Sequence, residues 1–173
     1  MNIILALDPS LSSTGYAFID LNNKSIITKG RITTSSKYST DDRIQLIIKE
    51  LENITSIHLE SESIINCVAL EDGYIGQNKG TSQKLCELRG ALIAYYKYNK
   101  IPVIHKQPKE IRKNLGLPGN VTKEKVAEEV LKLYPELESE VGEYSDKQNK
   151  NKTSDIYDAI SIGLSYLNLT EEA

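Results

Sequence analysis

The sequence predicts an α/β fold in which a five-stranded mixed sheet is flanked by helices. Two segments, 3–8 and 64–71, are apolar on both faces, as central buried strands are, and each ends in an acid. Three strand-like segments joined by short turns open the chain and indicate an antiparallel meander. Helical segments separate the later strands, which implies parallel crossovers.

The elements follow from turn, capping and periodicity signals along the chain. Strands are predicted at 3–8, 15–20, 24–34, 64–71 and 101–105. Helices are predicted from Thr40, at 81–98, at 108–115, from Thr122 to Pro135, and from Thr153 or Ser154 to Leu169. The polar stretches 72–80 and 143–152 are predicted loops, the second rich in lysine and asparagine.

Length and composition are those of one globular domain, predicted to span residues 1–173. No apolar run is long enough for a signal-peptide core or a membrane span, so we expect a cytoplasmic protein with no membrane partner. Cys67 and Cys86 lack any metal-binding spacing and are expected to be reduced, buried thiols. His58 and His105 have no partner motif either.

Charge is distributed unevenly along a chain whose net charge is −3. Between Lys79 and Lys125 eleven basic residues face three acids, a local charge of +8. The following segment, 128–146, holds seven acids and one lysine. A charge run is often only a solvated face, but a basic middle third is also what a phosphate-binding surface requires.

Asp8 and Glu71 are carboxylates at the carboxyl ends of the two most apolar strands. Ligand sites of α/β sheets gather at these strand ends. Asp8, followed by Pro9, has an alternative interpretation as a turn former. Glutamate is a poor turn residue, so Glu71 is harder to explain structurally.

Asp155 and Asp158 stand three residues apart at the start of the last helix, which places both on one face. An acid in the first turn of a helix is favoured by the helix dipole, which explains Asp155. It does not explain Asp158, which is one turn deeper and on the apolar face of the helix. Two like charges so placed call for a cation or a proton. Oxygen ligands without histidine or cysteine favour Mg²⁺, with Mn²⁺ as a substitute. A pair of such ions would support phosphodiester cleavage.

Three segments resemble the motif blocks of the RuvC Holliday-junction resolvases, which belong to the ribonuclease H-like superfamily. They are LALDPSLSSTGYAFID, ALEDGYIGQNKGTSQKLCELRGALI and KTSDIYDAISIGL. The stretch PKEIRKNLGLPGNVTKEKV resembles the basic segment of the family. The resemblance implies a ribonuclease H-like fold and a structure-selective endonuclease that resolves Holliday junctions or other branched DNA with two metal ions per site.

Carried over position by position, the resemblance implies roles for individual residues. The four acids Asp8, Glu71, Asp155 and Asp158 match the metal-binding and catalytic set. Tyr74 matches an aromatic residue that stacks on opened bases. Arg112 and Lys123 match basic positions near the cleaved phosphate, with Lys123 also catalytic. Lys79, Lys84 and Arg89 are further candidates for positioning DNA phosphates.

The resemblance also implies a homodimer that cuts two strands symmetrically, with the helix at 81–98 at the two-fold axis. Branch-migration proteins are expected partners if the chain is bacterial, and a phage origin is equally compatible with its Asn-, Lys- and Ile-rich composition. The chain departs from the family at Ser10, where glycine is usual, and in the stretch 136–152, which looks inserted.

Two other functions fit part of the sequence. The loop from Asp8 to Gly15 is also found in actin-like ATP-binding proteins, but those need two related domains and more than 173 residues. A non-catalytic nucleic-acid-binding member of the superfamily should have lost at least one of the four acids. All four positions are acidic here.

Overall fold

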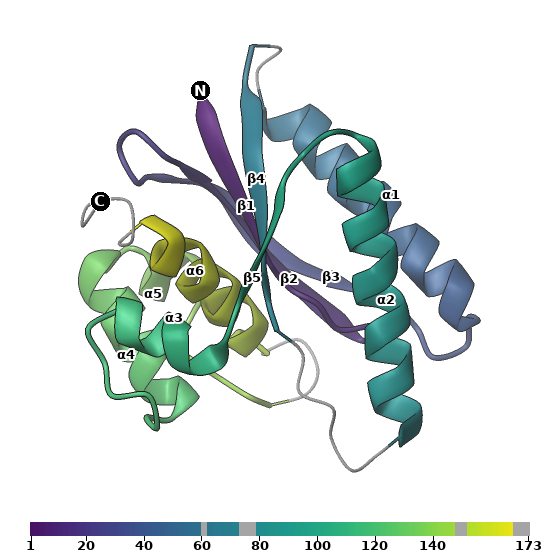
Figure 1. The fold of residues 1–173 in the computed structure, drawn as a ribbon. Helices are drawn as coiled ribbons and strands as arrows, with labels where there is room; N and C mark the ends of the chain where they lie inside the picture. The colour runs from purple at the N-terminus through teal and green to yellow at the C-terminus, as the bar shows by residue number, and fades with distance from the viewer. Residues whose placement is uncertain (60–61, 73–78, 148–151, 168–173) are drawn as a thin grey trace.

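The computed structural model describes residues 1–59, 62–72, 79–147 and 152–167. One mixed sheet lies at its centre, with the strand order β3-β2-β1-β4-β5 (Figure 1). The strands are β1 (Asn2–Asp8), β2 (Ser13–Asp20), β3 (Ile26–Thr33), β4 (Ile64–Glu71) and β5 (Val103–Lys106).

The pairing of the strands confirms the predicted mixed sheet. β1, β2 and β3 form an antiparallel meander, whereas β4 pairs in parallel with both β1 and β5. The parallel pair β1–β4 needs a crossover connection, because its strands run in the same direction. That connection contains β2, β3 and the helix that follows β3.

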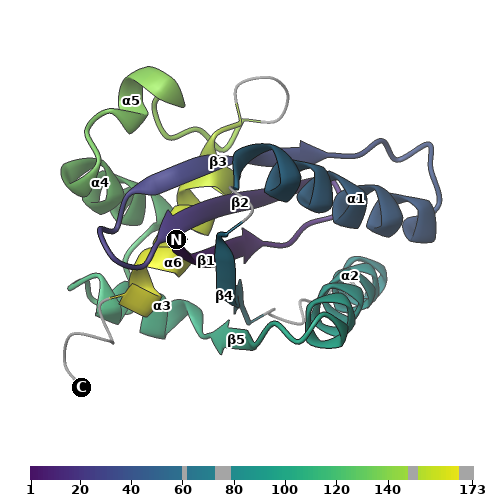
Figure 2. The same ribbon diagram turned by 90° about the horizontal axis from the view of Figure 1, so that it is seen from above.

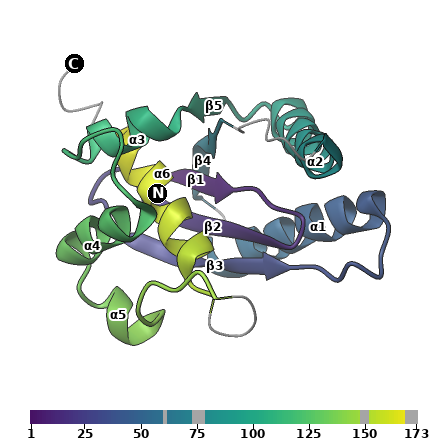
Figure 3. The ribbon, with the colours of Figure 1, turned by 90° about the horizontal axis from the view of Figure 1, so that it is seen from below.

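Helices cover both faces of the sheet. α1 (Thr40–His58) and α2 (Lys79–Tyr98) lie on one side and the remaining helices on the other, as Figures 2 and 3 show from opposite directions. The second group comprises α3 (Pro108–Asn114), α4 (Lys123–Leu133), α5 (Leu137–Glu140) and α6 (Ser154–Leu167). None of the helices in the described ranges is long and apolar enough to cross a membrane.

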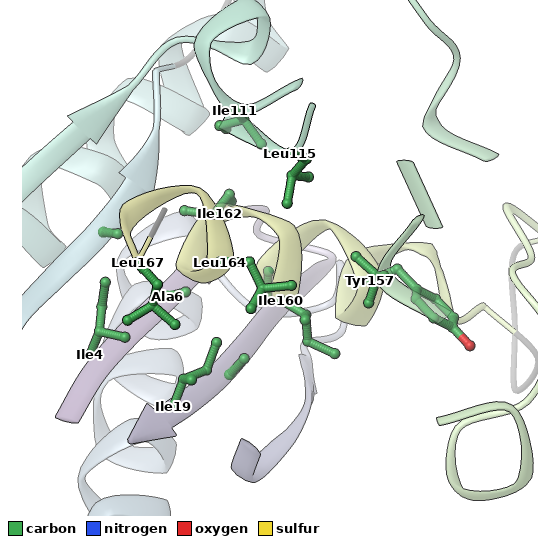
Figure 4. Close-up of a cluster of buried hydrophobic side chains, with 14 of the residues drawn as sticks. Ile4, Ala6, Ile19, Ile111, Leu115, Tyr157, Ile160, Ile162, Leu164 and Leu167 are labelled. Carbon is green, nitrogen blue, oxygen red and sulfur yellow. The ribbon is translucent and has the colours of Figure 1, made fainter. Parts of the chain in front are cut away.

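Alternation along β1 divides the interior into two cores. Ile4 and Ala6 point toward α6 and pack with Ile160 and Ile162 in the core shown in Figure 4. Ile3, Leu5 and Leu7 point the other way, into the core beneath α1 and α2. Because both faces of the strand are covered, it carries apolar residues at every position up to Asp8.

Several boundaries differ from the sequence-based prediction. β2 begins at Ser13, α2 begins at Lys79 and β5 is shifted to 103–106. Cys67 is buried as predicted, but the prediction was wrong for Cys86, which is exposed. The fully buried Leu88 is two positions further along α2, a rotation of about 200° around an α-helix, so Cys86 lies on the opposite side. The predicted end of the last helix at Leu169 lies outside the described residues.

The acidic stretch before α6 is folded against the sheet, and the short helix α5 within it was not predicted. Leu137 of α5 is fully buried, and Lys29 of β3 forms an ion pair with Glu140. Farther along, Tyr157 of α6 donates to the carbonyl of Gly142 over 2.7 Å. This stretch therefore braces the amino-terminal half of α6.

Candidate metal and nucleic-acid site

Asp8 and Glu71 lie side by side at the carboxyl edge of the sheet. In the parallel pairing of β1 with β4, Leu7 is opposite Leu70, so the next residue of each strand is the acid. Side chains alternate between the faces of a strand, and Ala6 and Ala69 belong to the core on the α6 side. Asp8 and Glu71, two positions further on, therefore point toward α6.

Gly15 brings the two acids of α6 to this edge. It is the antiparallel partner of Asp8 in β2, and the backbone of Asp155 packs directly against it. A β-carbon at position 15 would lie only 1.9 Å from the carbonyl oxygen of Asp155. The lack of a side chain at Gly15 thus allows the start of α6 to approach Asp8.

Replacement of Gly15 by alanine should therefore displace α6 from β2. Relief of so close a contact with backbone needs a shift of the helix, and overpacking of this kind costs about 1–3 kcal/mol or more. We expect a lower melting temperature together with loss of divalent-metal binding, measured by calorimetry. Gly90 is a matched control, because a β-carbon there meets no atom within 4 Å. A Gly15→Ala protein with unchanged metal affinity would contradict this account.

Burial and mutual repulsion raise the pKa values of three of the acids. The pKa of Asp8 is raised well above its usual range by desolvation and by the charge of Asp158, against an opposing effect of Lys123. Desolvation also raises the pKa of Glu71 and that of Asp158. Perturbed carboxyl groups gathered at strand ends are typical of functional sites.

Lysine ammonium groups neutralise the two acids of α6. Lys123 donates to Asp158 Oδ2 over 2.5 Å, and Lys152 lies 2.9 Å from Asp155 Oδ1. Burial alone would lower the pKa of Lys123, but the attraction of Asp158, Asp8 and Glu71 outweighs it and the pKa is raised. The cluster therefore attracts positive charge strongly.

The donor set fits a hard divalent cation. Asp155 Oδ2 is buried without a hydrogen-bond partner in the described structure, as expected of an oxygen reserved for a metal. Among the residues described, no group of three or more acidic, histidine or cysteine side chains is arranged so that it could hold a metal ion as the side chains stand. Asp158 and Asp155 are instead engaged with lysines, so a metal ion would take over the role of these ammonium groups.

The predicted DNA-binding residues divide into groups with different surroundings. Arg112 and Lys123 line a hollow beside Glu71 and Asp158, and Arg112 also donates to the carbonyl of Gly119 over 2.9 Å. Lys79 and Lys84 are exposed on α2. Tyr74 lies outside the described residues.

Arg89 holds the end of β4 in place. Its guanidinium donates to the carbonyl oxygen of Glu71 and, over 3.2 Å, to Asp72. His105 also lies 3.2 Å from that carboxylate, and Gln107 donates to it over 2.6 Å. These contacts make Arg89 a candidate positioning residue for Glu71, and its predicted role in positioning a DNA phosphate stays a prediction.

Sequence reasoning missed Asp72, His105, Gly15 and Lys152 as parts of the site. Asp72 carried one available signal, since it directly follows Glu71. The others depend on which strands and helices meet, and a single sequence does not contain that information. His105 becomes relevant only because β5 lies beside β4.

The sequence and the fold were compared with known proteins. The family model described as crossover junction endodeoxyribonuclease RuvC matches residues 4–166. A protein of that name from Ehrlichia ruminantium (strain Gardel) is 30% identical over 131 residues, covering 73% of this chain and 78% of that protein. Another from Chlorobium chlorochromatii is 31% identical over 127 residues, 72% of this chain and 64% of the relative.

Solved structures share the fold at low sequence identity. The structure of Thermus thermophilus RuvC in complex with a Holliday junction substrate superimposes with a TM-score of 0.72 at 16% identity, covering 99% of this chain and 96% of that one. The yeast mitochondrial Holliday junction resolvase gives 0.65 at 14% identity, over 98% and 79% of the two chains. The fowlpox virus resolvase with its junction DNA gives 0.60 at 15% identity, over 96% and 99%.

Proposed function

Because this chain belongs to the RuvC family of crossover junction endodeoxyribonucleases, we propose that it is a metal-dependent endonuclease that cuts four-way DNA junctions. One observation carries the proposal: Asp8, Glu71, Asp155 and Asp158 come from three separate segments and gather at one edge of the sheet. Buried acids that repel one another destabilise the protein unless a cation or a proton neutralises them, and a bound metal ion is such a cation. We propose that the protein acts on four-way DNA junctions in the cytoplasm.

The four carboxylates would hold Mg²⁺, with Mn²⁺ as a substitute, and we propose two ions per site. When bound by these residues, such ions would supply an activated water and compensate the negative charge on the leaving 3′-oxygen. In the hydrolysis a bond forms between water oxygen and phosphorus while the bond from phosphorus to the 3′-oxygen breaks. The proton lost by water passes to solvent, and the 3′-oxygen takes one up.

The chain's own residues orient this reaction. Arg89 fixes the backbone of Glu71, and Gly15 lets Asp155 approach Asp8. Lys123 and Arg112 line the hollow beside the acids and can hold the phosphate oxygens as negative charge develops. Preorganised donors of this kind cost no reorganisation at the moment of reaction.

We also propose that the protein acts as a homodimer, since the symmetric resolution of a junction requires two cuts. The exposed face of α2 is the proposed surface at the two-fold axis. Tyr74, in the segment that precedes this helix, stays a candidate for stacking on opened bases. Association with branch-migration proteins stays a prediction that applies if the chain is bacterial.

Cleavage of a synthetic four-way junction in Mg²⁺ tests the proposed function. Wild-type protein should produce paired nicks near the branch point and leave a linear duplex of the same sequence intact. Asp158→Asn should bind the junction with affinity close to wild type but cut it at least about 10²-fold more slowly, because one metal ligand is lost.

Glu50→Gln is a suitable control, since it removes a negative charge from the exposed face of α1. It should cut like wild type. Equal cleavage by Asp158→Asn and wild type would refute the metal-site assignment. Equal cleavage of linear and four-way DNA would refute junction selectivity.

A further inference from the structure

A row of three neighbouring hollows, here called the groove, leads from the acids toward α1. Three hollows follow one another along it, and neighbouring hollows share residues. The hollow with Arg112 and Lys123 shares Glu71 and Pro108 with the next one, which also contains Asp8. That second hollow shares Pro9 and Leu85 with a third. Figure 3 shows the β1–β2 connection, which contains Pro9, extending to the side of the sheet where α1 and α2 lie.

The third hollow has the chemistry of an anion site. Its charged lining residues are Arg43 of α1 and Lys84 of α2, and no acid contributes to the lining. The hydroxyl-bearing residues Ser10 and Ser12 line it as well. Asp41, Asp42 and Glu87 line a separate hollow between α1 and α2, which shares no residue with this one. The third hollow is therefore lined by positive charge alone, although acids lie nearby on the same two helices.

Arg43 is held rigidly at this position. Its Nε donates to Thr34 Oγ1 over 2.7 Å, and that hydroxyl in turn donates to the carbonyl of Leu11 in the β1–β2 loop. Within the described residues this is the only hydrogen bond of the Arg43 guanidinium. The N–H groups of its two terminal nitrogens therefore have no hydrogen-bond partner there. Such a fork, fixed at Nε, is suited to bidentate binding of a phosphate.

The loop beside Arg43 is also fixed. Thr14 Oγ1 donates to the carbonyl of Ser10 over 2.7 Å and accepts from the Ser10 amide over 3.2 Å. The hydroxyls of Ser10 and Ser12 lie 3.1 Å apart. One of these hydroxyls donates to the other, so the pair presents one remaining O–H donor at the edge of the groove, at the position where Ser10 departs from the family pattern.

We propose that Arg43, assisted by Lys84 and the hydroxyls of Ser10 and Ser12, binds a backbone phosphate of the strand that is cut. This phosphate lies on the opposite side of the acids from Arg112 and Lys123. The inference rests on the proposed function, because it takes the ligand to be DNA. The two basic ends of the groove then hold the strand across the four carboxylates, which by themselves would repel it.

Binding to a four-way junction in EDTA, measured over a range of salt concentrations, tests the subsite without cleavage. Arg43→Gln should weaken binding about tenfold, the loss expected when a charged hydrogen bond is removed. The slope of log K against log salt should fall by about 1, since one phosphate contact is lost. Lys49→Gln, on the exposed face of the same helix, is the matched control and should change the slope less.

Two further measurements separate phosphate binding from a structural role of Arg43. Thr34→Val breaks the tether but keeps the charge, so it should retain the wild-type salt slope. In a set of junctions, each junction carries one neutral methylphosphonate in place of a phosphate. At one position near the cut site this replacement should weaken binding by wild type but not binding by Arg43→Gln. Equal sensitivity of both proteins at every position, or an Arg43→Gln slope equal to that of wild type, would overturn the subsite.

The outcomes also distinguish this subsite from the proposed function. If Arg43→Gln weakens binding to linear and four-way DNA alike and wild type cuts neither, the subsite stands and junction cleavage fails. If wild type cuts junctions while Arg43→Gln binds them like wild type, the function stands and the subsite fails.

Discussion

Replacement of Asp8 by asparagine should abolish cleavage while stabilising the metal-free protein. Asp8 lies among Glu71, Asp155 and Asp158, and its pKa is raised well above the ordinary value of 3.8 by burial first and then by the charge of Asp158. A raised carboxyl pKa means that the folded state disfavours the ionised form. Stability is therefore lost as the pH rises from the ordinary pKa through the raised one. Asparagine removes that loss.

Thermal unfolding in EDTA between about pH 4 and pH 8 measures the effect. Asp8→Asn should melt above wild type at neutral pH, by about 2–4 °C for each kcal/mol gained, and the difference should shrink toward pH 4. Mg²⁺ should raise the melting temperature of wild type more than that of the variant, because a ligand that binds the folded state more tightly stabilises it more. Asp41→Asn, in the exposed first turn of α1, should do neither.

Junction cleavage by Asp8→Asn should fall at least about 10³-fold, because one of the proposed metal ligands is lost. Loss of cleavage without a gain in metal-free stability would show that the acids do not repel one another in the folded protein. Unchanged cleavage would remove Asp8 from the site. The two measurements thus test the catalytic role and the electrostatic strain separately.

The fold was predictable because local and global signals agree in this chain. β1, and β4 from Cys67 onward, read as continuous apolar runs because both of their faces are covered there. The meander and the crossovers followed from the order of the elements. The acids at the ends of these strands were conspicuous for the same reason. Asp158 was conspicuous as well, because it lies on a helix face that is otherwise apolar and is only 8% exposed.

Properties that depend on contacts between distant segments could not be predicted from the sequence. The basic middle third predicted one phosphate-binding face, yet Lys106 is buried in an ion pair with Glu110 and Arg89 is committed to the end of β4. Arg43 lies outside that basic third, and only the packing of α1 brings it to the groove. Residue type gives the charge, whereas tertiary packing decides whether that charge is available to a ligand.

Removal of the Lys123 ammonium should destabilise the metal-free protein, the opposite of the effect expected for Asp8→Asn. Lys123 pairs with Asp158, whose side chain is only 11% exposed, and also faces Asp8 and Glu71. Its raised pKa means that the folded state stabilises the charged form throughout the neutral range. Lys123→Met should therefore destabilise the metal-free protein by roughly 1–2 kcal/mol, a value reduced because about half of the lysine side chain is exposed to solvent.

The same variant should bind Mg²⁺ more tightly and cut more slowly. Calorimetry should show the higher affinity, because no ammonium competes for Asp158. Cleavage should fall about 10²–10³-fold with little change in junction affinity, if Lys123 stabilises charge that develops on the phosphate. Tighter metal binding with slower cleavage cannot arise from a site that is merely disrupted, since disruption would weaken both.

A double-mutant cycle with Asp8→Asn completes the test. Lys123 and Asp8 attract each other, so the acids repel one another more strongly once Lys123→Met has removed the ammonium. Neutralising Asp8 should relieve part of this repulsion. The stability of the double variant should then lie above that of Lys123→Met, although neither protein cuts efficiently. Equal melting temperatures of Lys123→Met and wild type in EDTA would show that Lys123 does not neutralise the cluster. Its role would then be confined to the bound phosphate.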